Sequence, residues 1–182
     1  MREIEIKFRV KDLEDIEGKL KKQKFLISKN IKQHDVVYSD GKLDYSTSSR
    51  EGIVAVRIRH QDNIALLTVK KQMSNEMDNI EYETEVSDAK AVDKMLLLLG
   101  WRPEVEVIKN RRKGKLGEYE ICLDEVESLG SFIEIEKMAD DGTNPEKVRA
   151  EILKTAEKLG ISKKDEETRG YDTQIYQLKN LK

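Results

Sequence analysis

The segment at residues 3–9 alternates strictly between charged and apolar side chains. It reads EIEIKFR, so Glu3, Glu5 and Lys7 occupy odd positions, and isoleucine or phenylalanine occupies the even ones. Because side chains alternate between the two faces of a β-strand, this spacing predicts a strand with one charged face and one apolar face. Such a strand fits either an antiparallel sheet with one solvated face or a barrel with a wet interior.

The alternation recurs in later segments that read as extended chain. We predict strands over residues 26–38, 53–60, 64–71, 79–86, 105–112, 118–126 and 131–138. Residues 61–63 and 113–117 separate neighbouring strands at hairpin spacing. We therefore expect an antiparallel sheet in which Arg112 and Lys113 belong to a solvated turn.

The sequence predicts fewer helices than strands. We predict helices over residues 11–24, 88–99, 145–159 and 171–178, and a polar loop over residues 41–50. Asp12 and Asp88 are placed to cap the first two helices, and Pro145 fits the first position of the third. The first two helices also belong to a faint repeat, offset by 76 residues, in which each copy is a strand, a capped helix and a second strand.

Composition excludes several classes of function. The 34 basic and 36 acidic side chains leave a net charge of −2, which gives no reason to expect nucleic-acid or membrane binding. Cys122 is the only cysteine, which rules out an internal disulfide and a cysteine-based zinc cluster. The sequence shows no signal peptide or transmembrane span, so we expect a cytoplasmic protein whose residues 1–182 form one domain.

Charges of one sign are grouped by strand. Acidic pairs stand at Glu3/Glu5, Glu83/Glu85 and Glu134/Glu136, and a basic pair stands at Arg57/Arg59. On an exposed sheet such pairs would gain little, because surface ion pairs contribute only about 0–1 kcal/mol. In a concave site, carboxylates roughly 7 Å apart along a strand can hold one hydrated metal ion or two neighbouring ones. Arginines at the same spacing can bind successive phosphates.

Acids and bases together favour one kind of ligand, a polyanion that arrives with divalent metal ions. A triphosphate with Mg²⁺ or Mn²⁺ fits this description, and the lack of histidine or thiolate ligands favours those metals over zinc or copper. A closed or nearly closed barrel would bring the charged faces into one lumen. That lumen must contain water or ligand, because burying so many charges in a dry interior costs several kcal/mol per ion.

Several short motifs along the chain resemble those of a known family. The motif ExExK stands as Glu3, Glu5 and Lys7, followed by VRIR at 56–59, TVK at 68–70, ETEV at 83–86, IKNR at 108–111, LDEVESLGSFIEIE at 123–136 and GYDTQIY at 170–176. These motifs resemble the CYTH superfamily, the triphosphate tunnel enzymes that include class IV (CyaB-type) adenylate cyclases and thiamine triphosphatases. The resemblance covers essentially the whole chain.

The resemblance implies an α+β fold in which an eight-stranded antiparallel barrel has helices packed outside. It implies metal binding by Glu3, Glu5, Asp124, Glu134 and Glu136, and triphosphate binding by Lys7, Arg57, Arg59, Lys70, Lys109 and Arg111. Glu83 and Glu85 are similar to further tunnel acids, and the segment around Tyr171 is expected near one tunnel mouth. Lys7 is also the candidate catalytic residue, since neighbouring cations can lower the pKa of a lysine. Glu81 has the parity of a lumen residue and could balance nearby bases.

Three functions remain open on the sequence. The favoured one is an adenylate cyclase that converts ATP to cyclic AMP and pyrophosphate. The second is a triphosphatase acting on tripolyphosphate, thiamine triphosphate or a nucleoside triphosphate. The third is a polyphosphate-binding protein without catalysis. In each case the partner is a small-molecule triphosphate, and the oligomeric state, a homodimer included, is not readable from the sequence.

Overall fold

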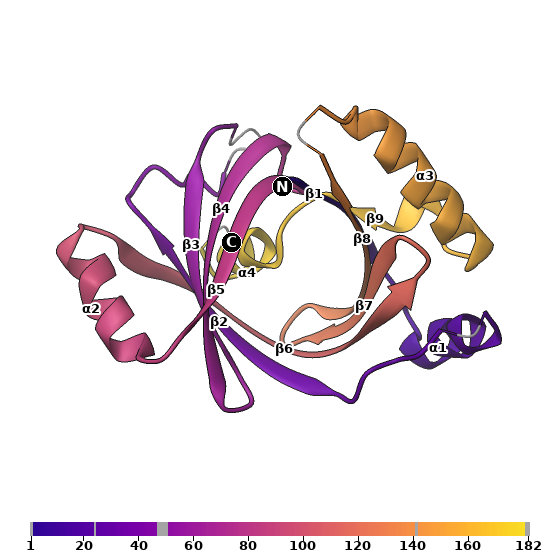
Figure 1. The fold of residues 1–182 in the computed structure, drawn as a ribbon, viewed down its shortest axis with the longest axis horizontal. Coiled ribbons are helices and arrows are strands. Elements are labelled where there is room, and N and C mark those ends of the chain that lie inside the picture. Colours follow the sequence, from indigo (N-terminus) through magenta and orange to yellow (C-terminus); the bar gives the residue numbers. More distant parts are fainter. Residues whose placement is uncertain (1, 24, 47–50, 141, 181–182) are drawn as a thin grey trace.

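The chain forms a closed antiparallel β-barrel with helices around it (Figure 1). The computed structural model describes residues 2–23, 25–46, 51–140 and 142–180. Its strands are β1 (Arg2–Arg9), β2 (Ile31–Ser39), β3 (Val54–Gln61), β4 (Ile64–Asn75), β5 (Asp78–Val86), β6 (Arg102–Leu116), β7 (Tyr119–Val126), β8 (Gly130–Ala139) and the short β9 (Glu166–Glu167). Its helices are α1 (Leu13–Lys22), α2 (Ala89–Leu98), α3 (Pro145–Lys158), the 3₁₀ turn η1 (Lys163–Asp165) and α4 (Tyr171–Asn180).

The barrel closes through β1. The strand order is β5-β4-β3-β2-β6-β7-β8-β1, and β1 pairs with β5 as well as with β8. In the β1–β8 register, Glu5 lies opposite Glu136 and Lys7 lies opposite Glu134. Closure therefore turns the charged face of β1 toward the charged faces of the other strands.

The strand order also supports the internal repeat. The first copy is β1-α1-β2-β3-β4 and the second is β5-α2-β6-β7-β8. When each strand is exchanged for its counterpart in the other copy, the order reads the same in reverse. The two halves are therefore related by an approximate two-fold arrangement of the strands.

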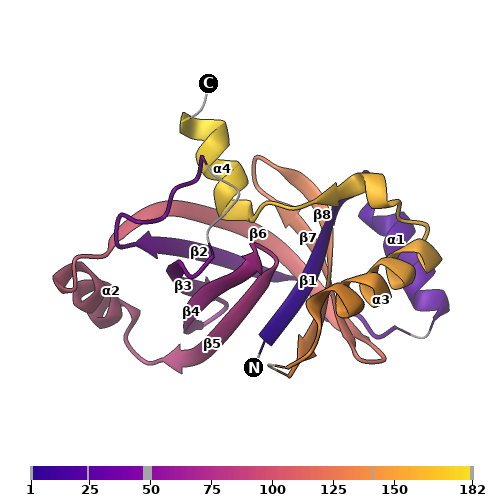
Figure 2. The same ribbon diagram turned by 90° about the horizontal axis from the view of Figure 1, so that it is seen from above.

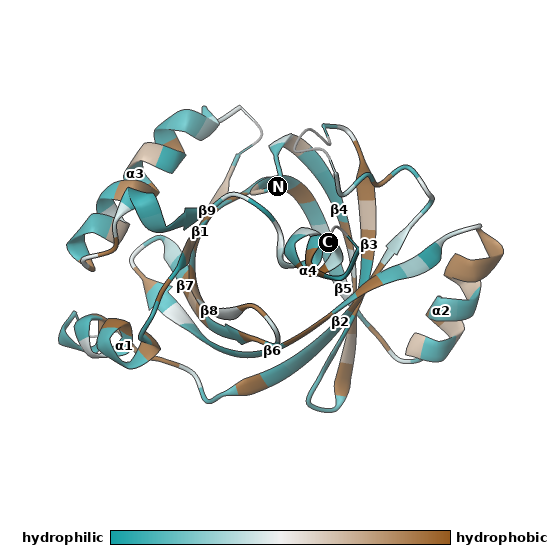
Figure 3. Cartoon of the chain, turned by 180° about the vertical axis from the view of Figure 1, so that it is seen from behind, coloured by the Kyte–Doolittle hydropathy of each residue, from teal (hydrophilic) through white to brown (hydrophobic). Residues whose placement is uncertain are grey.

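The apolar faces of the strands point outward, beneath the helices. Ile4, Ile6 and Phe8 of β1 are buried in a cluster that includes residues of α1 and α3, such as Leu20 and Ile152. On the other side of the barrel, α2 packs on outward residues of β2 and β3. Figure 3 shows hydrophilic and hydrophobic colours alternating along the strands. Most of the hydrophobic core thus lies between barrel and helices. The charged side chains face the lumen, together with apolar residues on which α4 packs.

Helix α4 differs from the other helices in its position. It lies at one end of the barrel, while the chain's N-terminus lies toward the other end (Figure 2). Tyr171 and Ile175 of α4 pack on Val37 and Val107, which belong to β2 and β6. The expectation that the segment around Tyr171 lies near a tunnel mouth agrees with this placement.

The main correction to the predicted elements concerns the hairpin at residues 113–117. Strand β6 continues to Leu116, so Arg112 and Lys113 are strand residues and not part of a solvated turn. Arg112 pairs with Glu17 of α1. At Gly114 a Cβ atom would clash with the carbonyl oxygen of Leu26, so the strand passes close to the α1–β2 connection.

The remaining predicted strands and helices are present, with shifts at their ends. Extended pairing in the second predicted strand begins only at Ile31. Lys24 of the first predicted helix and residues 47–50 of the predicted loop lie outside the described residues. Within the described part of the chain, no helix combines the length and apolar character needed to cross a membrane.

Candidate active site

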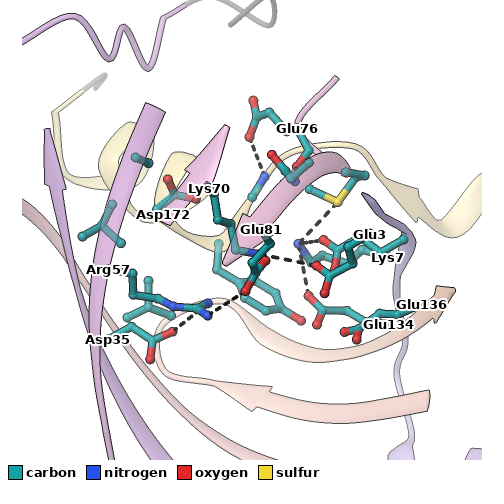
Figure 4. Close-up of a pocket in the computed structure, with 18 of the residues that line it drawn as sticks. Glu3, Lys7, Asp35, Arg57, Lys70, Glu76, Glu81, Glu134, Glu136 and Asp172 are labelled. Atoms are coloured by element: carbon teal, nitrogen blue, oxygen red, sulfur yellow. Dashed lines mark hydrogen bonds and ion pairs between the residues drawn. The ribbon is translucent and has the colours of Figure 1, made fainter. Parts of the chain in front are cut away.

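The barrel encloses a cavity of about 250 Å³ (Figure 4). Charged side chains from β1, β3, β4, β5, β6 and β8 line it. The predicted site residues among them are Glu3, Glu5, Lys7, Arg57, Arg59, Lys70, Glu83, Lys109, Arg111, Glu134 and Glu136. Of the predicted set, only Asp124 and Glu85 are not part of the lining.

Acidic side chains gather where β1 and β8 face the lumen. Glu5, Glu134 and Glu136 each offer a carboxylate oxygen, and the three oxygens lie within 4.8 Å of one another. Figure 4 shows Glu3 beside Glu134 and Glu136, close to Lys7. An all-oxygen set of this kind fits a hard divalent cation such as Mg²⁺ or Mn²⁺, whose ligands are mainly carboxylates and water.

The acids differ in how readily they ionise. Burial, followed by Glu134, raises the pKa of Glu5 to about 7. Burial and Glu3 also raise the pKa of Glu136 well above its usual value. Burial opposes ionisation of Glu134 as well, but Arg111 and Lys7 lower its pKa well below the ordinary range. Glu134 is therefore already paired with protein cations, whereas Glu5 and Glu136 lack a full countercharge, which a divalent ion would supply.

Lys7 lies at the centre of this acidic group. Its Nζ is 3.3 Å from a carboxylate oxygen of Glu134 and 4.0 Å from one of Glu5. Burial alone would lower the pKa of Lys7, but Glu134 and Glu5 raise it above the ordinary value. The expected lowering of the Lys7 pKa is therefore wrong for the ligand-free protein, because its nearest charged neighbours are acids and not cations. Burial and Arg111 lower the pKa of Lys109 instead.

The arginine pair on β3 is held by an aspartate that the sequence analysis did not single out. Asp35 on β2 accepts hydrogen bonds from Nε and Nη2 of Arg59 at 2.7 and 2.8 Å, and it lies 3.7 Å from Nη1 of Arg57. Burial opposes ionisation, but Arg57 and Arg59 lower the pKa of Asp35 below its usual value. Asp35 therefore fixes both guanidinium groups in the wall of the cavity.

Lys70 links the basic and acidic parts of the lining. Its Nζ pairs with Glu81 and lies 3.5 Å from a carboxylate oxygen of Glu3. Glu81 also lies 3.5 Å from Nη2 of Arg57. Glu81 thus balances nearby bases, as its parity allowed, and Figure 4 shows it with Lys70 between Arg57 and Glu3.

Asp124 lies behind the lining, not in it. It is fully buried, and it accepts hydrogen bonds from Arg111 Nε at 2.7 Å, Lys109 Nζ at 3.3 Å and the hydroxyl of Tyr171 at 3.0 Å. These partners use both carboxylate oxygens. In this ligand-free arrangement Asp124 contacts two cations that line the cavity, and the metal binding that the resemblance implied stays a prediction.

Glu83 and Glu85 lie on the same strand but in different surroundings. Glu83 lines the cavity and accepts hydrogen bonds from Arg57 at 3.2 Å and Thr68 at 2.8 Å. Glu85 is exposed and lies outside the lining, near the end of β5. The structure thus brings Glu83, but not Glu85, into the cavity lining beside Arg57.

Residues from the α4 end complete the lining. Glu76, in the turn between β4 and β5, accepts hydrogen bonds from the backbone N–H of Gly170 and the hydroxyl of Thr173, both at 2.7 Å. This contact fixes the start of α4, and Tyr171 and Asp172 then face the cavity. The motif at residues 170–176 marked the segment that contains Tyr171 and Asp172, but no local pattern marks Glu76, because its role depends on where α4 docks.

A comparison of the sequence with models of protein families identifies the family of this chain. The model of the family described as "CYTH domain" matches residues 1–171. The chain belongs to the CYTH family. Among curated CYTH relatives, it is 30% identical over 165 residues to the "Putative adenylate cyclase MJ0240" of Methanocaldococcus jannaschii, covering 90% of this chain and 92% of that one. It is 27% identical over 171 residues to "Adenylate cyclase CyaB" of Aeromonas hydrophila, covering 94% and 87%.

Solved structures agree with the CYTH fold. The PH1819 protein from Pyrococcus horikoshii OT3 superimposes with a TM-score of 0.81 at 27% identity, over 97% of this chain and 99% of that one. The protein described as "Putative adenylyl cyclase HpAC1" from Hippeastrum, with a dominant triphosphatase activity, superimposes with a TM-score of 0.61 at 19% identity, over 98% of this chain and 96% of that one. At that identity the second likeness concerns the fold alone.

Proposed function

We propose that this CYTH protein is a metal-dependent adenylate cyclase that converts ATP to cyclic AMP and pyrophosphate. The observation that carries the proposal is the shared cavity, in which Glu5, Glu134 and Glu136 stand together while Arg57, Arg59 and Lys70 line other walls. A triphosphate that arrives with a divalent cation needs both kinds of wall at once. The names of the two curated relatives support cyclisation as the reaction.

The residues of the chain divide the work in this proposal. Arg57, Arg59 and Lys70 bind and align the phosphates, so that the ribose 3′-hydroxyl lies in line with the α-phosphorus. Lys7 remains protonated and donates hydrogen bonds to the phosphate chain, in agreement with its raised pKa. Glu3, Glu5, Glu134 and Glu136 would hold Mg²⁺ or Mn²⁺, which when bound neutralises charge that develops on the phosphate oxygens.

Hydrolysis of a triphosphate is the second candidate. The charged groups of the cavity would bind the phosphate chain, which is common to the substrates of cyclisation and hydrolysis. In hydrolysis, water attacks the terminal phosphorus and orthophosphate is released. Polyphosphate binding without turnover is the third candidate.

Product analysis separates the three. Purified protein is incubated with ATP, thiamine triphosphate or tripolyphosphate in the presence of Mg²⁺ or Mn²⁺, and the products are resolved. Cyclic AMP with pyrophosphate supports the cyclase, whereas orthophosphate supports the triphosphatase. If no substrate is turned over with either metal, the result contradicts the proposal, and polyphosphate binding without catalysis is the remaining candidate.

A matched pair of variants tests the metal-binding role of the acidic wall, the name we give to Glu5, Glu134 and Glu136 on β1 and β8. Glu5→Ala should lower kcat by at least about 100-fold, because it removes a carboxylate from the proposed metal site. Glu85→Ala is the control, since Glu85 is an exposed glutamate outside the cavity lining, and its activity should match that of the wild type. An unchanged rate in Glu5→Ala would rule out the metal role.

A further inference from the structure

One sector of the cavity lining carries no charge. It consists of Val37 on β2, Leu43 after β2, Ile53 and Ala55 at the start of β3, and the amide side chains of Gln72 and Asn79. Apart from Met77, Val107, Gly170 and Tyr171, the other residues in the lining are acidic or basic. Docking of α4 accounts for part of this sector, because Val37, Leu43 and Ala55 belong to or pack on the hydrophobic cluster that contains Tyr171 and Ile175. Ile53, Gln72 and Asn79 lie outside that cluster, and a phosphate chain has no use for uncharged side chains, so these residues need a separate explanation. We call the full set the uncharged sector.

The uncharged sector is a continuous surface at the α4 end of the barrel. The backbone N–H of Gln72 donates to the carbonyl of Ile53 at 3.0 Å, and that of Gly52 donates to the carbonyl of Gln72 at 2.8 Å. Gln72 lies opposite Asn79 in the β4–β5 register. These contacts bring the two amide side chains beside the apolar residues at the start of β3.

Within this sector, Gln72 is a polar group without a partner. Its side chain is 7% exposed, and its Nε2 has no hydrogen-bond partner in the part of the chain that the structure describes. A buried N–H without an acceptor costs free energy, and a ligand that offers an acceptor removes that cost. Apolar walls with one or two placed polar groups are typical of pockets that bind flat organic groups.

The sector directly adjoins the cations that would bind the phosphates. Val37 lies opposite Arg57 in the β2–β3 register, and Ala55 lies opposite Lys70 in the β3–β4 register. A triphosphate held by Arg57 and Lys70 therefore has one end beside the uncharged sector. The organic group of a nucleotide-like substrate is attached at such an end.

We propose that the uncharged sector binds the nitrogen heterocycle of an organic triphosphate, with Gln72 donating a hydrogen bond to a ring acceptor. The proposal rests on the proposed function and makes it more specific, because it predicts a substrate with an organic group over bare tripolyphosphate. Ile53 and Leu43 supply apolar contacts to the faces of the ring. Gln72 determines specificity and does not touch the reacting atoms.

Binding measurements with two ligands test this assignment. The affinities for tripolyphosphate and for an ATP analogue with methylene-bridged phosphates are measured by calorimetry in the presence of Mn²⁺. Gln72→Leu should weaken binding of the analogue about tenfold, which corresponds to the loss of one hydrogen bond, and should change tripolyphosphate affinity less than twofold. Ile53→Ala should show the same selectivity through loss of apolar contact.

Gln33→Leu is the matched control. Gln33 is a buried glutamine on β2, two strands away from Gln72 in the sheet, and it lies outside the cavity lining. Its substitution should leave the ratio of the two affinities unchanged, and thermal unfolding of each variant verifies that it is folded. Thiamine triphosphate, tested in the same way, distinguishes a pyrimidine-bearing ligand from a purine.

The outcomes separate this inference from the proposed function. A selective loss with either heterocyclic ligand supports the inference and identifies the heterocycle. Equal weakening of the analogue and tripolyphosphate, or an unchanged affinity for both, overturns the inference while leaving triphosphate binding in place. If the wild-type protein binds neither ligand, the inference and the proposed function both fail.

Discussion

Glu5 shows what a single residue costs the fold at this site. Burial and the neighbouring Glu134 raise its pKa from 4.5 to about 7, so ionisation of Glu5 opposes folding. In the pH range below about 4.5 the carboxyl is protonated in both folded and unfolded chains, and it contributes nothing. Above pH 7 the folded protein bears the full penalty, up to about 3 kcal/mol.

Glu5→Gln should therefore stabilise the metal-free protein at high pH. We expect the variant to melt several degrees above the wild type at pH 8, because the glutamine removes a buried charge. The difference should disappear at pH 4, because Glu5 of the folded wild type is then protonated and uncharged. Thermal unfolding at the two pH values in the presence of a chelator measures the effect. A variant that melts below the wild type at pH 8 would contradict the crowding of acids at β1 and β8.

Ionisation of Asp35 stabilises the fold, whereas ionisation of Glu5 opposes folding. Its ionised carboxylate neutralises Arg57 and Arg59, and Asp35→Asn leaves two buried guanidinium groups without it. We expect a loss of about 3 kcal/mol in the free energy of unfolding, since breaking a buried ion pair costs roughly that much. Because tripolyphosphate can replace the missing charge, it should raise the melting temperature more in Asp35→Asn than in the wild type. An equal or smaller ligand-induced rise would argue against a phosphate-binding role for the two arginines.

At the scale of elements, α4 reaches the site through the ring of Tyr171. Nζ of Lys7 lies 4.0 Å from the ring centroid and Nζ of Lys109 lies 4.8 Å from it. Both ammonium groups thus lie over the ring, and its negatively polarised π-system attracts them. The hydroxyl makes a separate contact with Asp124.

This arrangement predicts different effects for two substitutions of Tyr171. Tyr171→Phe keeps the ring and should bind tripolyphosphate within about threefold of the wild type. Tyr171→Leu removes the ring and should weaken binding about tenfold, the equivalent of about 1.4 kcal/mol, because both lysines lose their orientation. Calorimetry measures both affinities. Equal losses in the two variants would assign the effect to the hydroxyl instead of the ring.

The elements also show how far sequence reasoning reaches. Alternation is a local property, so it predicted that Glu3, Glu5 and Lys7 share one face of a strand. The resemblance implied that Asp124 binds metal, but no local pattern shows that Tyr171 and two cations contact its carboxylate. Asp35 was missed because its strand lacks an alternating row of charges. Its importance arises from a pairing with Arg59, 24 residues later in the chain.

At the scale of the whole molecule, the site depends on closure of the barrel. Pairing of β1 with β5 and β8 brings Glu3 to Lys70, while Arg111 of β6 pairs with Glu134 of β8. The CYTH resemblance predicted this closure, whereas the residue pattern alone was equally compatible with an open sheet. In the ligand-free barrel, several acids and bases pair with one another across the lumen, as Glu3 does with Lys70 and Glu134 with Arg111. Substrate and metal must therefore exchange these internal pairs for their own contacts.

This exchange predicts that metal and phosphate bind cooperatively. A divalent cation at Glu5, Glu134 and Glu136 competes with Arg111 and Lys7 for Glu134, and so releases cationic groups for the phosphates. We expect Mn²⁺ to increase the affinity for tripolyphosphate at least tenfold, as measured by calorimetry. Glu5→Gln separates this effect from complex formation between Mn²⁺ and tripolyphosphate in solution. The variant should still bind tripolyphosphate but should respond much less to Mn²⁺, and a full response would place the coupling outside the acidic wall.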